Sequence, residues 1–145
     1  MLFSSPLAVG TVAPEFSVPD QDGNRITLSA HRDKNVILVF YPADDTSVCT
    51  RQLCEFRDNW AAVRAKNAVV FGVNPARSRA HQKFREKHQL PFPLLIDEGQ
   101  KIARLYQASG WLGPKRTVYL IGKDGKIRYA KRGRPSPAEV LTAAV

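Results

Sequence analysis

The sequence predicts an α/β fold, in which a mixed central sheet carries helices on both faces and an added N-terminal hairpin. Near-continuous apolar runs, typical of strands covered on both faces, occur at residues 35–41, 68–74 and 117–121. Helical patterns of apolar residues separate these runs. Asp-Gly pairs mark two hairpin turns. Because no repeat, low-complexity tract or linker divides the chain, we expect residues 1–145 to form a single domain.

The individual elements follow from these signals in chain order. Residues 16–28 predict a short hairpin that turns at Asp22-Gly23, and residues 123–126 predict a second turn with a return strand at 127–130. A short final helix is expected to begin near Ser136 or Pro137, because proline is favoured at the first helical position. The remaining helices are expected at residues 49–66, 78–88 and about 98–107.

Composition restricts the class of protein. The 145 residues are 43% hydrophobic and 24% charged, as in an ordinary globular protein. Two cysteines are too few for the disulfide framework of a small secreted domain. The N-terminal residues lack the charged and apolar regions of a signal peptide, and no run approaches the length of a membrane span. We therefore expect a cytoplasmic protein with no membrane association, in which a structural disulfide is disfavoured and a transient one is allowed.

The net charge of +9 is a weak signal. Basic residues are concentrated between Lys115 and Arg134, where much of the charge falls on the second predicted hairpin. Alternation along strands sends neighbouring side chains to opposite faces, whereas a nucleic-acid site would collect them on one face. The main interpretation is a solvated basic surface, and an anionic partner is the alternative.

Cys49 and Cys54 are the only cysteines, and they lie where a strand gives way to a helix. At 100° per residue, Cys49 lies at the centre of an apolar stripe, and Cys54 lies off that stripe. Ideal helix geometry puts their Cα atoms roughly 8.6 Å apart, beyond the limit of about 7 Å for a disulfide. A bond between them therefore requires the start of the helix to unwind. The stripe also contains Leu53, Phe56, Trp60 and Val63.

The position of Cys49 favours a reactive thiolate, because exposed amide groups and the positive end of the helix dipole stabilise an anion. The hydroxyl of Thr46 can donate to that thiolate or to a bound oxygen. Pro42 ends the strand, has no amide hydrogen and helps to shield the sulfur. The alternatives are a buried structural cysteine, a helix-capping threonine and a strand-terminating proline.

The pattern Pro42-x-x-x-Thr46-x-x-Cys49 resembles the signature of the peroxiredoxins, thiol peroxidases with a thioredoxin-like fold. The stretch from Thr50 to Asp58, with Cys54 at its centre, is similar to the PrxQ subfamily, also called bacterioferritin comigratory proteins. Further similar segments lie at residues 10–16, 71–73, 81–84, 90–95 and 116–121.

The resemblance implies a role for each residue of the motif. Cys49 would be the peroxidatic cysteine, which attacks hydrogen peroxide or a small organic hydroperoxide. Thr46 and Arg116 would position the peroxide oxygens and stabilise the thiolate, and Pro42 would shield the sulfenic acid. Cys54 would be the resolving cysteine, which forms an intramolecular disulfide with Cys49.

The resemblance also implies partners. Thioredoxin or a similar dithiol would reduce the disulfide. From the sequence itself we expect a monomer with no cofactor, no metal and no nucleic-acid partner. The chain departs from the family at Ser47-Val48, where Pro-Gly or another small pair is usual, and at Ala76, where an acidic residue is common.

Three other functions are compatible with parts of the sequence: a zinc site, a redox sensor and a nucleic-acid module. His31, His81 and His88 lack paired ligand spacing for zinc, and the last two are expected to be half-buried helix residues. A redox sensor using the same disulfide switch is the chief rival to an enzyme, and continuous turnover would distinguish them. A basic nucleic-acid module is the third class, and salt-dependent binding that survives Cys49→Ser would support it.

Overall fold

The computed structural model describes residues 5–145, which form a five-stranded mixed sheet and a separate two-stranded hairpin. The strand order is β5-β4-β3-β6-β7. β4 runs parallel to both β3 and β5, whereas β6 is antiparallel to β3 and β7. The strands of the large sheet are β3 (Asn35–Phe40), β4 (Ala68–Asn74), β5 (Leu94–Ile96), β6 (Thr117–Ile121) and β7 (Ile127–Arg132).

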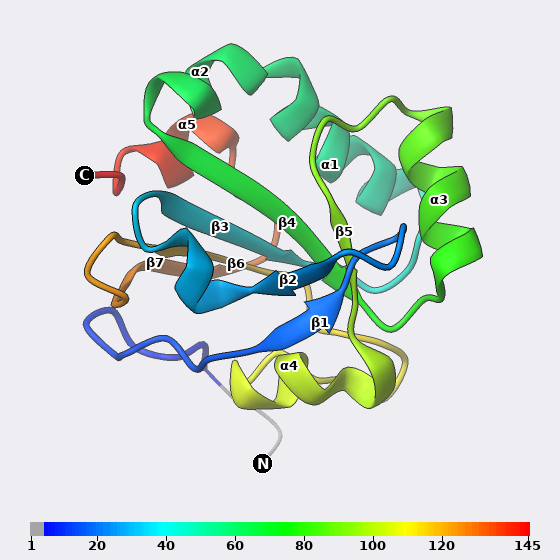
Figure 1. Ribbon diagram of the computed structural model, residues 1–145, viewed down its shortest axis with the longest axis horizontal. Helices are drawn as coiled ribbons and strands as arrows, with labels where there is room; N and C mark the ends of the chain where they lie inside the picture. The colour runs from blue at the N-terminus through cyan, green and yellow to red at the C-terminus, as the bar shows by residue number, and fades with distance from the viewer. Residues whose placement is uncertain (1–4) are drawn as a thin grey trace.

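Helices cover both faces of this sheet, as Figure 1 shows. Alternate residues of β3 point to opposite faces: Ile37 and Val39 join one core, and Leu38 and Phe40 join the other. The first core is closed by α1 (Ser47–Asp58), α2 (Trp60–Ala65), α3 (Ser78–Lys87) and α5 (Pro137–Leu141). The second is closed by α4 (Lys101–Leu105), the short 3₁₀ helix η1 (Leu28–His31) and the hairpin.

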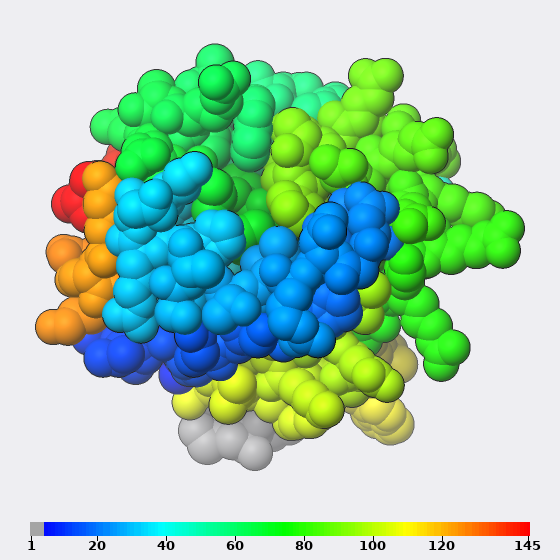
Figure 2. All heavy atoms as spheres, viewed as in Figure 1, coloured from blue at the N-terminus to red at the C-terminus, as the bar shows by residue number. Residues whose placement is uncertain are grey.

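The N-terminal hairpin consists of β1 (Ser17–Pro19) and β2 (Arg25–Thr27), paired antiparallel. Figure 2 shows it in blue across the front of the molecule, above the yellow-green α4. The side chain of Gln21 joins the hairpin turn to the sheet, because its Oε1 accepts a hydrogen bond from the amide of Leu94 at 2.9 Å. The predicted fold class, the hairpin and the three predicted strands are thus confirmed.

Three local expectations were wrong or incomplete. The helix predicted over 49–66 begins at Ser47 and is divided at Asn59, whose side chain donates to the carbonyl of Glu55 at 2.8 Å and competes with the helical pattern. The helix predicted over 98–107 is reduced to α4 after a 3₁₀ turn, η2 (Glu98–Gln100), in which Gly99 has a φ of 64°. The short strand β5 was not predicted, because three residues show no periodicity.

Helix α3 ends at Lys87, one residue before its predicted end, and α5 ends at Leu141. α3 and α5 begin where the sequence indicates, and Ser136 caps α5 by accepting from the amide of Glu139 at 3.1 Å. Among residues 5–145, no helix is both long and apolar enough to cross a membrane. The expectation that no signal peptide is present concerns residues 1–4 in part, and these lie outside the described residues.

Candidate functional site

Cys49 is the third residue of α1, which leaves the carboxyl end of the central strand β3. The first intrahelical hydrogen bond runs from the amide of Thr50 to the carbonyl of Thr46 at 2.8 Å. The amide groups of residues 47–49 therefore have no acceptor within the helix. Together with the helix dipole they create a positive environment around the cysteine. The predicted position at a helix start is confirmed.

Cys49 is 1% exposed and packs against the first core, with Leu53 and Phe56 on the same face of α1. The predicted apolar stripe is thus confirmed. A polar group reaches the sulfur: Nη2 of Arg116 lies 3.1 Å from Sγ of Cys49. This distance fits a charge-assisted hydrogen bond from the guanidinium to a thiolate.

Gln52 fixes the guanidinium of Arg116. Nη1 of Arg116 donates to Oε1 of Gln52 at 2.8 Å, and the Gln52 side chain also donates to the carbonyl of Gly133 at 3.4 Å. Gln52 is 1% exposed, so loss of this arrangement would leave a buried amide without partners. Gln52 belongs to no motif that the sequence alone distinguishes. Its place one turn after Cys49 was the available signal.

The sheet topology explains why Arg116 reaches a residue 67 positions away in the sequence. Phe40 at the end of β3 pairs with Thr117 at the start of the antiparallel strand β6. The residue before β6 therefore lies beside the loop that leaves β3. The amide of Gly133, after β7, donates to the carbonyl of Arg116 at 2.7 Å and fixes its backbone.

Pro42 and Thr46 lie in the loop between β3 and α1 and contact neighbouring backbone. Pro42 is half-buried, and its carbonyl is so close to Gly113 that a Cβ there would lie 2.8 Å from it. Gly113 also has a φ of 110°, which favours glycine. The hydroxyl of Thr46 donates to the carbonyl of Ala43 at 3.4 Å, and Thr46 itself is exposed. Pro42 thus lies against Gly113, in the loop that leads to Arg116, and the Thr46 hydroxyl is engaged within its own loop.

Both cysteines are free thiols, and Cys54 is half-buried at the edge of the first core. Burial raises the pKa of the Cys54 thiol, although the nearby guanidinium of Arg57 opposes this shift. Cys54 is therefore held in the protonated form at neutral pH. The two sulfurs consequently differ in environment: Cys49 accepts a contact from a guanidinium at a helix start, whereas for Cys54 the effect of burial outweighs that of the nearby Arg57.

A buried polar network that the sequence analysis missed holds the loop before Cys49. Oδ2 of Asp44 lies 2.7 Å from Nδ1 of His81, and Nε2 of His81 lies 2.9 Å from the carbonyl of Leu95. Since a carbonyl oxygen only accepts, Nε2 carries a hydrogen. The expectation that His81 is half-buried is wrong: its side chain is fully buried because both ring nitrogens have partners. His88 is half-buried, as predicted.

The other oxygen of Asp44 completes this network. Oδ1 accepts from the hydroxyl of Tyr41 at 2.7 Å and from the side-chain Nδ2 of Asn74 at 3.0 Å. Burial and the adjacent carboxylate of Asp44 raise the pKa of Tyr41 well above its usual value, so the hydroxyl keeps its proton and donates. The loop that precedes Cys49 is therefore anchored to β4, α3 and β5.

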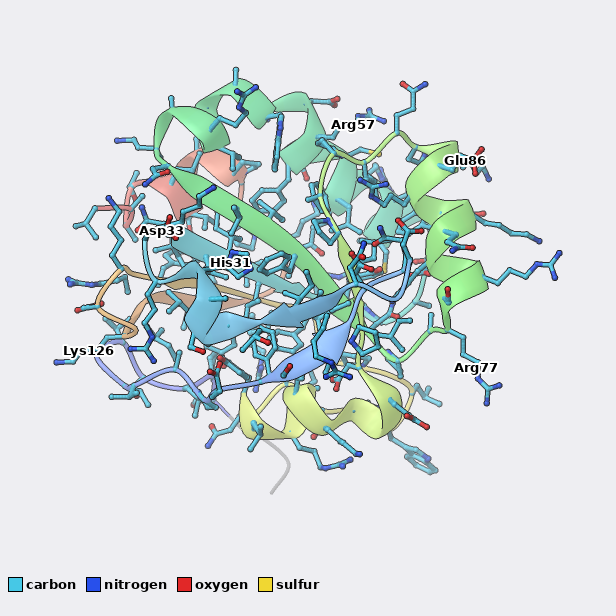
Figure 3. The ribbon with its side chains drawn as sticks, viewed as in Figure 1. His31, Asp33, Arg57, Arg77, Glu86 and Lys126 are labelled. Carbon is cyan, nitrogen blue, oxygen red and sulfur yellow. The ribbon has the colours of Figure 1, made fainter. Side chains whose placement is uncertain are left out.

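The three histidines do not converge on one site. His31 lies against the sheet (Figure 3), where its ring packs on Phe71 with centroids 5.3 Å apart. His81 belongs to the network described above, and His88 lies 3.3 Å from the exposed carboxylate of Asp45. In the described part of the chain, no group of three or more His, Cys, Asp and Glu side chains could hold a metal ion.

Comparison with known proteins gives a consistent result. Residues 9–130 match the AhpC/TSA family. A chloroplastic peroxiredoxin Q of Triticum aestivum is 38% identical over 131 residues, which cover 88% of this chain and 60% of the relative. The peroxiredoxin Bcp of Bacillus subtilis is 34% identical over 129 residues, which cover 83% of this chain and 82% of the relative. The chain thus spans about 60% of the length of the first chloroplastic relatives.

Solved structures agree with the fold. The peroxidoxin BcpB of Mycobacterium tuberculosis superimposes with a TM-score of 0.86 at 30% identity, covering 94% of this chain and 95% of that one. A PrxQ C47S mutant of Xylella fastidiosa also gives a TM-score of 0.86, with 24% identity and 96% coverage of both chains. The sheet order and the helix that carries Cys49 therefore belong to a recurrent architecture.

Proposed function

Because this chain belongs to the AhpC/TSA family, and within it to the peroxiredoxin Q and Bcp group, we propose that it is a thiol peroxidase. Its substrates are hydrogen peroxide and small organic hydroperoxides. The observation that carries the proposal is the 3.1 Å contact between the Arg116 guanidinium and Sγ of Cys49 at a helix start. A buried structural cysteine would have no need of a fixed cation at its sulfur.

The first step is an attack by the Cys49 thiolate on one oxygen of the hydroperoxide. A sulfur–oxygen bond forms, the O–O bond breaks, and the leaving alkoxide or hydroxide takes a proton to become an alcohol or water. Arg116 and the amide groups at the start of α1 stabilise the negative charge before and during this step. We propose that the Thr46 hydroxyl turns from the carbonyl of Ala43 to the peroxide oxygens when substrate binds, and that Pro42 limits access of water to the sulfenic acid.

The second step joins the two cysteines. The Cys54 thiol attacks the sulfenic sulfur of Cys49, a disulfide forms, and water leaves with the hydroxyl oxygen and the thiol proton. Because Cys49 and Cys54 belong to one helix and ideal geometry separates their Cα atoms by roughly 8.6 Å, the first turns of α1 must unwind. Unwinding also brings Cys54 into water, where its pKa returns toward the ordinary range and the thiolate becomes available.

A dithiol completes the cycle. One of its thiolates attacks the Cys49–Cys54 disulfide and forms a mixed disulfide with the enzyme. Its second thiol then attacks this mixed disulfide and releases the enzyme, so that two electrons and two protons have been transferred to Cys49 and Cys54. Thioredoxin or a similar protein fits this role. We further propose that the protein works as a monomer in a reducing compartment such as the cytoplasm. A single domain is supported by the two cores, which lie on opposite faces of one sheet.

The test is a steady-state assay with hydrogen peroxide, thioredoxin, thioredoxin reductase and NADPH. The parent protein should consume NADPH continuously. Cys49→Ser should be inactive, because no other thiol has this environment. Cys54→Ser should still react with one equivalent of peroxide but lose turnover with thioredoxin.

Each outcome is informative. One equivalent of peroxide should lower the intact mass of the parent by two hydrogens, as expected for an internal disulfide. Two free thiols after that treatment would refute the scheme. A single stoichiometric oxidation without turnover would identify a sensor. Equal turnover of Cys54→Ser and the parent would remove Cys54 as the resolving residue.

A further inference from the structure

Two large apolar side chains stand in solvent on the loop that leads to Arg116, the residue that contacts Sγ of Cys49. Trp111 is 98% exposed and Leu112 is 91% exposed. Single exposed apolar residues are common on protein surfaces and need no explanation. An exposed tryptophan next to an exposed leucine does need an explanation when the loop that carries them is rigid and adjoins a reactive site. Both conditions hold here.

The loop that carries this pair is held in one conformation by hydrogen bonds within the protein. The amide of Lys115 donates to the carbonyl of Ala108 at 2.6 Å and closes the base of the loop. The side chain of Gln100 binds Gly110 twice, donating to its carbonyl at 2.9 Å and accepting from its amide at 3.0 Å. A preorganised loop loses little conformational entropy when it binds a partner. The exposure of the apolar tip is therefore a built feature and not the result of a loose segment.

The loop also forms part of the wall around Cys49. Gly113, directly after the apolar pair, lies against the carbonyl of Pro42. Arg116, four positions after Leu112, contacts Sγ of Cys49 at 3.1 Å. A folded protein that brings its thiol to the site around Cys49 is large enough to contact the loop tip as well, whereas a small dithiol is not.

Basic side chains predominate in the segments that meet at Gln52 and Arg116, whereas Asp44 and Asp45, in the loop before Cys49, pair with groups of α3 and His88. Three segments meet there, residues 47–52, 107–116 and 131–136, joined by the contacts of Gln52 and Arg116 with Gly133. These segments contain no acidic residue. Glu55 and Glu139, from outside them, pair with two of their basic residues and leave the positive charge in excess. The basic residues are Arg51, Lys115, Arg116, Lys131, Arg132 and Arg134.

We propose that Trp111 and Leu112 anchor the docking of the folded dithiol protein that reduces the Cys49–Cys54 disulfide. The partner presents an apolar centre surrounded by acidic side chains around its own reactive thiol. This inference rests on the proposed peroxidase function, in which the reductant contacts the sulfur in every cycle. Tryptophan is strongly enriched among residues that dominate binding energy, and the basic surroundings accelerate the encounter with an acidic face.

The experiment compares a protein reductant with a small one. Trp111→Ala, Leu112→Ala and the parent are assayed with an acidic bacterial thioredoxin and, separately, with dithiothreitol. The control is Leu105→Ala, a truncation of a 51% exposed leucine on α4. Because Trp111 is almost fully exposed, its replacement should leave folding intact, which circular dichroism would verify.

We expect Trp111→Ala to raise the KM for thioredoxin about tenfold, with a smaller increase for Leu112→Ala and none for Leu105→Ala. Turnover with dithiothreitol should stay unchanged in all variants. The KM of the parent for thioredoxin should rise with salt concentration, because screening weakens the attraction.

Other results would overturn the inference. An unchanged KM for thioredoxin would show that the tip does not contact the reductant. An equal loss with dithiothreitol would show that the loop acts on the sulfur itself. A dimer in sedimentation experiments that Trp111→Ala dissociates would assign the tip to a second copy of this chain. In each of these cases, peroxidase activity of the parent protein with dithiothreitol would still support the proposed function. A parent protein with no activity with dithiothreitol would refute the proposed function itself, independently of the docking site.

Discussion

The contact between Arg116 and Cys49 makes a quantitative prediction about the reaction with peroxide. Arg116→Met keeps the length of the side chain but removes the donor that lies 3.1 Å from Sγ. A hydrogen bond to a charged group contributes about 1.5–3 kcal/mol. At about 1.4 kcal/mol per factor of ten, its loss should slow the oxidation of Cys49 about 10- to 100-fold. The lower part of this range is favoured, because the guanidinium is half-buried and partly screened.

The second-order rate constant can be measured by competition with a haem peroxidase for hydrogen peroxide. The matched control is Arg51→Met, which removes an exposed guanidinium from α1, the helix that carries Cys49. Nε of Arg51 lies 3.4 Å from the carbonyl of Ser47. Arg116→Lys should recover only part of the rate, because an ammonium group cannot hold the sulfur and Gln52 with one rigid fork. Equal rates for Arg116→Met and Arg51→Met would refute the assignment of Arg116 to the site.

Two further predictions concern the loop and the second cysteine. Asp44→Ala should lower the free energy of unfolding by about 3 kcal/mol, because it removes the carboxylate that binds buried His81 and its neighbours. The control is Asp45→Asn, which changes an exposed carboxylate. Asparagine tolerates the φ of 58° at this position, so the free energy of unfolding should change little. Equal urea midpoints for these two variants would contradict the role of the network. In a Cys49→Ser background, alkylation of Cys54 should reach half its maximal rate at a higher pH in the native protein than in urea, because burial raises the pKa of this thiol. Coincident native and denatured profiles would show that the sulfur is already solvated in the folded helix.

Much of the fold could be predicted because it depends on local periodicity. The burial of Cys49, Leu53 and Phe56 follows from their spacing along one helix, and the continuous apolar character of residues 35–40 follows from a strand covered on both faces. The helix break at Asn59 was missed, because one side-chain hydrogen bond to the carbonyl of Glu55 outweighed a continuing pattern. A single hydrogen bond changes the free energy by too little to be visible in the spacing of apolar residues.

The reactive sulfur and its helix start were determined by the sequence itself, since neighbours along the chain define both. The surroundings of that sulfur were decided by tertiary structure. The pairing of Phe40 with Thr117 brings Arg116 to Cys49, and the pairing of β3 with β4 brings Asn74 toward Asp44. No local pattern encodes these approaches, because strand register is set by the packing of whole faces of the sheet. The buried pair of Asp44 and His81 has the same origin: its two members are 37 positions apart and meet only when α3 packs beside the loop.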